Sequence, residues 1–250
     1  MSAPILSVHD LARAFDGVEA VRGVSFEVAA GERVALIGPN GAGKTTCFNL
    51  INGQLAPDRG RVLLDGARID GLPARAIAAR GVGRTFQVAA TFASMTVKEN
   101  AAVALLAAHG AEAAMHGGLD AVEREARALL ERADLGALAD AHCATLAYGD
   151  AKRVELALAL ARRPRLLLMD EPTAGAGGAA REAVMRLVAD VVRAGDAAVL
   201  FTEHDMDVVF AHADRVIVLD RGEIIAIGAP AAIRADARVQ AAYLGTPVSP

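Results

Sequence analysis

The chain has 250 residues, enough for one large domain or two closely joined ones with a sizeable core. Its 26 Lys and Arg residues against 30 Asp and Glu residues give a formal net charge of −4. Nothing in this balance indicates the basic patch that usually accompanies a nucleic-acid partner. The two cysteines, Cys47 and Cys143, form neither a disulfide framework nor a metal-binding spacing. We therefore expect a reducing, cytoplasmic setting, with no signal peptide and no membrane-spanning run, because arginines interrupt residues 155–169.

Short apolar runs at residues 5–8 and 24–28 predict two strands, joined by the turn-like residues 15–17. Phe15 lies ahead of a glycine-rich segment. An aromatic side chain there either stacks on a nucleobase or belongs to the core, and its spacing alone favours the core. A third apolar run at residues 33–37 has the composition of a buried strand.

The segment after this third strand matches the phosphate-binding pattern G-x-x-x-x-G-K-[ST]. A helix is predicted over residues 45–51, so strand, glycine-rich loop and helix follow one another as the motif requires. The glycines let backbone N–H groups turn into one concavity, to which the helix dipole adds positive potential. Lys44 is predicted to reach the β- and γ-phosphates and the Thr45 hydroxyl to ligate Mg²⁺. An ordinary glycine-rich turn is the alternative, which these flanking elements disfavour. The predicted phosphate-binding residues are Gly38, Pro39, Asn40, Gly41, Ala42, Gly43, Lys44, Thr45 and Thr46.

Three further elements are predicted before the middle of the chain. Residues 61–64 have the composition of a strand closed by a turn. Residues 73–80 predict a helix with proline in its first turn. Residues 81–87 run from a strand into a loop that contains Gln87.

The middle of the chain changes character from about residue 96 to residue 141. Apolar residues recur there at every third or fourth position, which predicts helices. Glycines at Gly110 and at Gly117-Gly118 indicate separate helices with loops between them. We therefore interpret residues 91–145 as a helical subdomain inserted into an α/β protein.

Two acidic residues follow a buried strand in the second half of the chain. Residues 146–150 precede a helix predicted over 151–161, and the strand at 166–169 leads directly into Asp170 and Glu171. In open α/β sheets ligands bind at this carboxyl edge. Asp170 is predicted to hold Mg²⁺ through water, and Glu171, which points the other way, to polarise an attacking water. A solvated acidic turn is the alternative, which the phosphate-binding loop upstream disfavours.

A histidine follows the next strand at the same predicted edge. Residues 181–192 predict a helix, residues 197–201 a strand, and His204 comes three residues later. A lone histidine usually has a structural role, but a contact with a γ-phosphate is the functional alternative here. The remaining predicted elements are a hairpin of strands 215–220 and 223–227 and a helical tail over 231–244.

Taken together, these motifs resemble those of ATP-binding-cassette transporter ATPases, and the resemblance covers nearly the whole chain. More closely, the chain is similar to one of the two cytoplasmic ATP-binding subunits of branched-chain amino-acid importers. Many NTPases share the phosphate-binding loop, so other segments carry the resemblance: Arg84–Gln87, Met95–Asn100, Leu146–Asp150, Glu203–Met206, Ala213–Val216 and Ala242–Gly245.

The resemblance implies an α/β fold with a P-loop NTPase core. Its parts would be a mostly parallel sheet, an N-terminal antiparallel β subdomain and the inserted helical subdomain. The core and the antiparallel subdomain would span residues 1–90 and 145–250, and the helical subdomain about 91–145. The implied location is peripheral, on the cytoplasmic face of the inner membrane.

The resemblance also implies a mechanism in which two cassettes enclose two ATP molecules head to tail. Each ATP lies between one subunit's phosphate-binding loop and the signature loop of the other. The implied roles are adenine stacking by Phe15, Mg²⁺ coordination by Thr45, Gln87 and Asp170, general-base catalysis by Glu171, and a γ-phosphate contact by His204. The signature loop comprises Leu146, Ala147, Tyr148, Gly149 and Asp150. The implied cofactors are ATP and Mg²⁺, and the implied partners are a second cassette, two permease subunits and, indirectly, a substrate-binding protein.

The chain departs from the family pattern in two places. The signature usually carries serine where Ala147 stands and glutamine where Ala151 stands, and Gly177-Gly178 replaces Asp-Pro or Asn-Pro. Both departures lie on the face given to the partner. They leave open an ATP-binding subunit with weak hydrolysis, besides a lipopolysaccharide-type exporter or a soluble P-loop kinase or GTPase. The transported substrate stays open among branched-chain amino acids, other amino acids, urea and amides.

Overall fold

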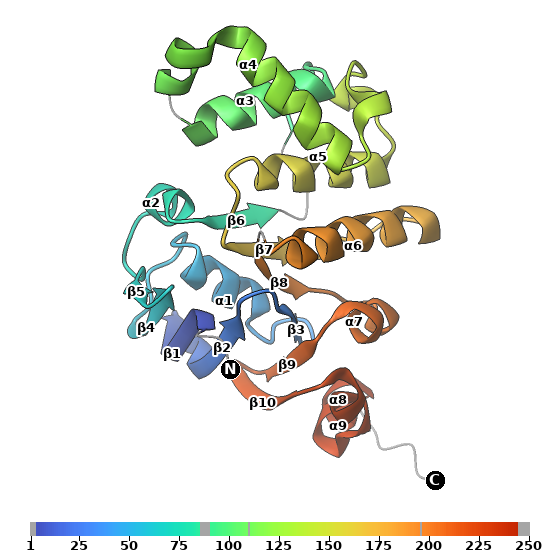
Figure 1. Ribbon diagram of the computed structural model, residues 1–250. Coiled ribbons are helices and arrows are strands. Elements are labelled where there is room, and N and C mark those ends of the chain that lie inside the picture. Colours follow the sequence, from blue (N-terminus) through green and yellow to red (C-terminus); the bar gives the residue numbers. More distant parts are fainter. Residues whose placement is uncertain (1–3, 86–90, 110, 196, 245–250) are drawn as a thin grey trace.

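The computed structural model describes residues 4–85, 91–109, 111–195 and 197–244 of the chain. A six-stranded sheet with strand order β10-β9-β3-β8-β7-β6 runs through its centre (Figure 1). Five of these strands are parallel, and β10 pairs antiparallel with β9 at one edge. The strands are β3 (Arg33–Ile37), β6 (Val82–Thr85), β7 (Leu166–Asp170), β8 (Ala198–Thr202), β9 (Arg215–Asp220) and β10 (Glu223–Gly228).

A second, antiparallel sheet of four strands packs against helix α1 (Lys44–Ile51). Its strands are β1 (Pro4–Phe15), β2 (Val18–Ala29), β4 (Arg59–Leu64) and β5 (Ala67–Arg68). The strands predicted at 5–8 and 24–28 are parts of longer ones, joined by the predicted turn at 15–17. At Asp10 the backbone has a φ of 47° and the pairing of β1 with β2 shifts register. This bulge breaks the alternation of side chains, so the pattern underestimates both lengths.

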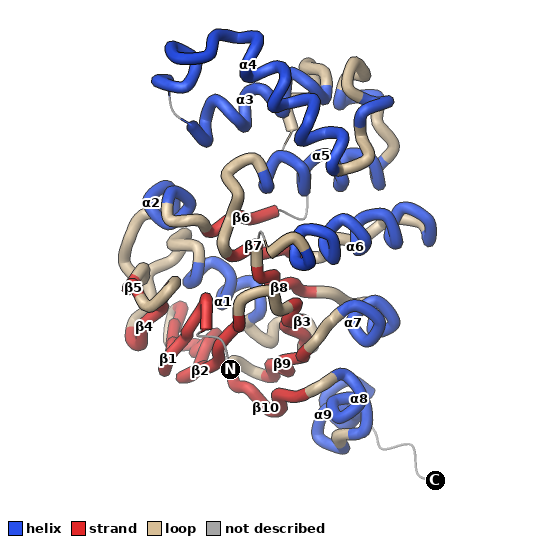
Figure 2. Tube along the Cα trace, in the orientation of Figure 1, coloured by secondary structure: helices blue, strands red, loops and turns tan. Residues whose placement is uncertain are grey.

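Helices cover the central sheet and extend away from it. They are α2 (Ala74–Ala79), α3 (Val97–His109), α4 (Ala111–Arg132), α5 (Tyr148–Leu160), α6 (Gly178–Arg193), α7 (Met206–His212), α8 (Pro230–Ala235) and α9 (Ala237–Leu244). Helices α3 and α4 lie beyond α5, away from all strands (Figure 2). The predicted break near residue 118 is confirmed, because Gly118 has a φ of 68° within α4, whereas Gly110 lies outside the described residues. No helix in the described ranges combines the length and apolarity needed to cross a bilayer.

The C-terminal tail, predicted as one helix over 231–244, consists of two. Asp236 adopts an extended conformation between α8 and α9. Its carboxylate accepts a hydrogen bond of 2.8 Å from the backbone N–H of Arg238 and also pairs with the Arg238 guanidinium. Aspartate is a favoured N-cap because it satisfies N–H groups that the first helical turn leaves open. The tail prediction is therefore wrong at this point.

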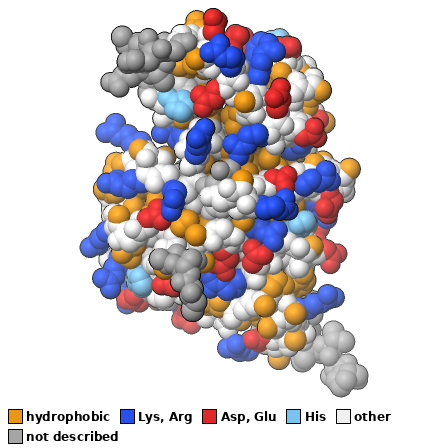
Figure 3. All heavy atoms as spheres, viewed as in Figure 1, with side chains coloured by type: hydrophobic (Ala, Val, Ile, Leu, Met, Phe, Trp, Pro, Cys, Tyr) orange, Lys and Arg blue, Asp and Glu red, His pale blue; other side chains and the backbone are white. Residues whose placement is uncertain are grey.

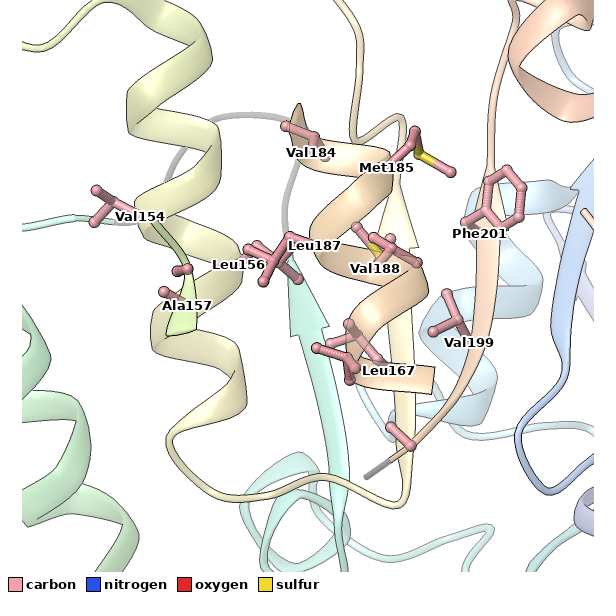
Figure 4. Packing of buried hydrophobic residues seen from close by; sticks show 14 of the residues in the cluster. Val154, Leu156, Ala157, Leu167, Val184, Met185, Leu187, Val188, Val199 and Phe201 are labelled. Atoms are coloured by element: carbon pink, nitrogen blue, oxygen red, sulfur yellow. The ribbon is translucent and has the colours of Figure 1, made fainter. Parts of the chain in front are cut away.

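Two hydrophobic clusters bury opposite faces of the central sheet. Leu166 and Leu168 of β7 pack toward α1 and the antiparallel sheet, whereas Leu167 and Met169 pack toward α5 and α6. Figure 4 shows the second cluster, in which side chains of α5 and α6 meet those of β7 and β8. Burial on both faces explains why these strands are continuous apolar runs. On the surface in Figure 3, basic and acidic side chains lie interspersed with hydrophobic ones.

Candidate functional site

The glycine-rich loop between β3 and α1 is held against neighbouring backbone. Gly43 has a φ of 104°, and a Cβ on it would lie 2.3 Å from the carbonyl oxygen of Ala20. A Cβ on Gly38 would lie 2.1 Å from the carbonyl oxygen of Leu219. Side chains do not fit at such distances, so glycine is required at both positions. The loop thereby presents the N-terminus of α1, which begins at Lys44, as an anion-binding end.

Lys44 lies over this loop and is only 9% exposed. Its Nζ donates hydrogen bonds to the carbonyl oxygens of Gly38 at 2.6 Å and Pro39 at 3.1 Å. Burial lowers the pKa of Lys44, and the nearby carboxylates of Glu171 and Asp170 oppose this shift. The ammonium group therefore lies between the loop and the two acidic residues, where a phosphate would meet it.

A cavity of about 210 Å³ brings the predicted motifs together. Its lining comprises Ala20, Asn40, Gly41, Ala42, Gly43, Lys44, Thr45, Thr46, Asp170, Glu171 and His204. Seven residues of the phosphate-binding loop thus face both predicted carboxylates and the histidine. A larger hollow of about 890 Å³ adjoins the loop beside α9, and its acidic and basic lining residues are Asp220, Arg221 and Arg238. The smaller cavity is the candidate reaction site, because it holds Lys44, Glu171 and His204 together.

Thr202, the last residue of the neighbouring strand β8, holds both acidic residues. The Thr202 hydroxyl donates to Asp170 Oδ1 at 2.7 Å, and the backbone N–H of Glu171 donates to the same hydroxyl at 3.1 Å. Glu171 has a φ of 49°, a left-handed conformation that costs an ordinary residue about 1–2 kcal/mol. Its Oε1 lies 2.8 Å from His204 Nε2. The strained turn therefore aims Glu171 at the histidine, while Asp170 stays on the strand.

Arg84 is a charged residue at this edge to which the sequence assigned no role. Its Nη2 lies 3.6 Å from Asp170 Oδ2, and its Nη1 donates to Asn49 Oδ1 at 2.6 Å and Gln54 Oε1 at 2.8 Å. Burial lowers the pKa of Arg84, and the charge of Asp170 opposes that shift. Arg84 therefore ties the end of β6 to α1 and to the Asp170 carboxylate. In the sequence, Arg84 stands out only as part of segment 84–87, one of those that resemble the ATP-binding-cassette pattern.

The residues predicted to hold Mg²⁺ fit that ion as far as the structure describes them. Thr45 and Asp170 both line the cavity. A hydroxyl and a carboxylate are hard oxygen ligands, and Mg²⁺ commonly takes one or two carboxylates together with phosphate oxygens and water. Gln87, the third predicted ligand, lies outside the described residues.

Phe15 is apart from this cavity. The residue is 39% exposed, which contradicts the core position that its spacing favoured. The Arg13 guanidinium lies over the ring at 5.1 Å from its centroid, a cation–π contact. Phe15 is not among the described residues that line the cavity, and adenine stacking by Phe15 stays a prediction.

The signature residues also lie elsewhere, at the start of α5. None of residues 146–150, all of them described, lines the cavity. The helix predicted from residue 151 begins at Tyr148 with Ala147 as its N-cap, so the prediction is wrong by one turn. A Cβ on Gly149 would lie 2.5 Å from the Cβ of Ala180, so α5 touches the first turn of α6. The exposed Tyr148 ring packs on Gly175 in the loop that follows Glu171.

The comparison with protein families agrees with this arrangement. A model described as ABC transporter matches residues 21–174, which include the phosphate-binding loop, residues 146–150 and both carboxylates. The chain belongs to the ABC transporter family. A second model, described as branched-chain amino acid ATP-binding cassette transporter, matches residues 223–249 of this cassette. The recognition made from sequence motifs is confirmed.

Relatives of the cassette cover almost its whole length. The high-affinity branched-chain amino acid transport ATP-binding protein BraF of Pseudomonas aeruginosa is 39% identical, over 98% of this chain and 99% of BraF. The lipopolysaccharide export system ATP-binding protein LptB of Escherichia coli is 36% identical, over 96% of this chain and 97% of LptB. Among solved structures, the ADP conformation of MJ1267, an ATP-binding cassette of an ABC transporter, has a TM-score of 0.87 and 29% identity, with 98% and 100% of the two chains covered.

These likenesses establish the fold class and the reaction. The predicted α/β fold, with a mostly parallel sheet, an N-terminal antiparallel sheet and helices apart from both, is confirmed. Membership of the family makes this ABC cassette a nucleotide-binding ATPase. Its neighbours among known proteins are ATP-binding components of transporters.

Proposed function

We propose that the cassette hydrolyses ATP to energise a membrane importer of branched-chain or related amino acids. The observation that carries the proposal is the 2.8 Å contact between Glu171 and His204 in the cavity that Lys44 borders. It supports the proposal because the Glu171 carboxylate, which can accept a proton, lines the same cavity as the phosphate-binding loop. The importer class is supported by the model matched at residues 223–249 and by the higher identity to BraF than to LptB.

Each residue in the cavity has a proposed role. Lys44 and the backbone N–H groups of residues 41–45 hold the phosphates of ATP. Thr45, Asp170 and Gln87 would hold Mg²⁺, which would neutralise negative charge on the transferring phosphate. Glu171 accepts a proton from the attacking water. His204 orients the Glu171 carboxylate and contacts the γ-phosphate.

The proposed assembly contains a second cassette, two permease subunits and, indirectly, a substrate-binding protein. The signature residues at the start of α5 do not line this chain's own cavity. We assign them to the ATP of the partner cassette, which completes the second site head to tail. The assembly places the cassette at the cytoplasmic face of the inner membrane, as a peripheral subunit.

Two alternatives have observations in their favour. The 36% identity to LptB keeps a lipopolysaccharide-type exporter as the second candidate. Ala147 and the Gly177 N-cap of α6, which brings no side-chain acceptor, favour a cassette that contributes weakly to its partner's site. ATP hydrolysis by the assembled transporter separates importer from exporter. The ATPase of an importer responds to a binding protein loaded with branched-chain amino acid.

The purified cassette is expected to hydrolyse ATP weakly and the assembled transporter much faster. The reason is that each ATP site needs a signature loop from another chain. Hydrolysis is measured for the dilute subunit and for the complex in proteoliposomes, with and without loaded binding protein. Full activity of the dilute monomer would contradict the proposed assembly, and stimulation by lipopolysaccharide alone would favour the exporter.

Replacing Ala147 with Ser is expected to raise hydrolysis at the partner's ATP site. A serine hydroxyl there donates to the γ-phosphate, and hydrogen bonds to charged groups contribute about 1.5–3 kcal/mol. Closure around that ATP then tightens about ten- to a hundredfold. The rate is measured in the assembled complex, with this chain's Glu171 intact and with it disabled. No rise in either background would show that backbone contacts suffice.

Ala147 is also the N-cap of α5, so the stability of the Ala147→Ser variant is measured as well. Serine at an N-cap stabilises a helix by about 1 kcal/mol relative to alanine. The thermal unfolding midpoint of the variant subunit is therefore recorded alongside its activity. A higher midpoint without faster turnover assigns the hydroxyl to the helix alone.

A further inference from the structure

A buried carboxylate next to His204 has no role in the mechanism proposed for ATP hydrolysis. Glu203 follows strand β8 and is 3% exposed. Its Oε1 accepts two hydrogen bonds from Thr173, from the backbone N–H at 2.8 Å and from the hydroxyl at 2.6 Å. Its Oε2 accepts a longer one of 3.3 Å from the backbone N–H of His204. Thr173 is equally buried, at 3%.

These bonds join two short segments residue by residue. Thr202 accepts the backbone N–H of Glu171, Glu203 holds Thr173, and His204 contacts the Glu171 side chain. The segment from Glu171 also closes on itself, because the N–H of residue 174 donates to the carbonyl oxygen of Glu171 at 3.1 Å. The turn that bears Glu171 is therefore anchored at its start by Thr202 and at its third residue by Glu203.

A carboxylate suits this position because two donors converge on one of its oxygens. Hydrogen bonds to an ionised acceptor are stronger than those between neutral groups, and a buried charge is tolerated only when it is well hydrogen-bonded. A glutamine in place of Glu203 has one acceptor oxygen. With that oxygen toward Thr173, the glutamine places its NH₂ group against the backbone N–H of His204. With the oxygen toward His204, it places NH₂ against the backbone N–H of Thr173.

We propose that Glu203 is a positioning residue for hydrolysis, which keeps the Glu171 carboxylate in contact with His204 by holding the turn at Thr173. Glu203 does not touch substrate. It acts through Glu171, so the inference rests on the proposed general-base role of that residue. Loss of the anchor lets the left-handed turn relax and the two catalytic side chains separate, while the phosphate-binding loop, on other elements, keeps its affinity for ATP.

The test compares Glu203→Gln with wild type in the assembled transporter, whose partner cassette has its own base disabled. We expect kcat to fall by between about tenfold and 10²-fold, with KM for ATP within about twofold of wild type. Thr173→Val, which deletes the hydroxyl donor, shifts kcat in the same direction. Thr173→Ser, which keeps that donor, restores it. Glu223→Gln neutralises an exposed carboxylate on β10 and serves as the matched control with wild-type kinetics.

The variants of Glu171 and Glu203 distinguish a failure of the general-base role from a failure of the positioning role. Wild-type hydrolysis by Glu171→Gln would remove the general-base assignment, whatever Glu203→Gln does. An inactive Glu171→Gln together with wild-type kcat in Glu203→Gln would overturn the positioning role alone. A fall of kcat and ATP affinity together with a lowered thermal midpoint would also overturn it, because that pattern is a general loss of structure. A Thr173→Ser variant as slow as Thr173→Val would likewise contradict the positioning role.

Discussion

Replacing Glu171 with Gln is expected to slow ATP hydrolysis by the assembled transporter by about 10²–10⁴-fold, the usual contribution of one positioned base. The amide cannot take a proton from water. It keeps nearly the same shape and an oxygen that can face His204 Nε2, which lies 2.8 Å from the carboxylate. ATP binding stays intact, because Lys44 and its loop are unchanged. Steady-state hydrolysis and the affinity for a fluorescent ATP analogue measure the two effects.

A closed dimer that retains ATP is the expected product of this substitution. It is detected by gel filtration as a species of twice the subunit mass in the presence of ATP. Glu182→Gln is the control, since this glutamate lies on α6 with its side chain 63% exposed and near His212. Unchanged turnover by Glu171→Gln would rule out Glu171 as the base and direct attention to another group in the cavity.

Replacing Lys44 with Ala is expected to abolish tight ATP binding. Truncating one member of a buried, hydrogen-bonded charge pair costs about 2–5 kcal/mol, which corresponds to about 30-fold to several thousandfold in Kd. We expect a large increase in Kd because the Lys44 ammonium is buried between the loop carbonyls and the two carboxylates. Titration with a fluorescent ATP analogue measures the change directly.

Lys98→Ala is the control for this loss, because Lys98 pairs with Asp140 on the helical part of the molecule, outside the cavity. Its Kd for the analogue should equal that of wild type. The thermal midpoint of each variant without nucleotide shows whether the fold is intact. Tight ATP binding by Lys44→Ala would mean that backbone N–H groups alone hold the phosphates.

The sequence was sufficient for those parts of the site whose chemistry is local. The glycine-rich loop and the acids after β7 are contiguous patterns, and the rule that ligands bind at the carboxyl edge of parallel strands brought them together. The contact between Thr173 and Glu203 could not be predicted, because it joins residues 30 positions apart through side chains that have many other options. The pairing of Arg84 with Asn49, 35 positions away, is of the same kind.

The predicted lengths of strands and helices differ from the structure where a single residue interrupts a repeating pattern. The bulge at Asp10 ended the alternation of β1 early, and the cap at Asp236 divided the C-terminal tail. The signature helix began a turn sooner than predicted, because Tyr148 and Gly149 have poor intrinsic helix preference and tertiary packing on Gly175 and Ala180 outweighs it.

The close approach of Gly149 to Ala180 limits which residues the two positions accept. One contact with no room for a methyl group joins α5, the helix that we assign to the partner's ATP, to the first turn of α6. That turn follows the loop leading from this chain's own Glu171. A substitution tolerated on one side of the contact therefore changes which substitutions are tolerated on the other.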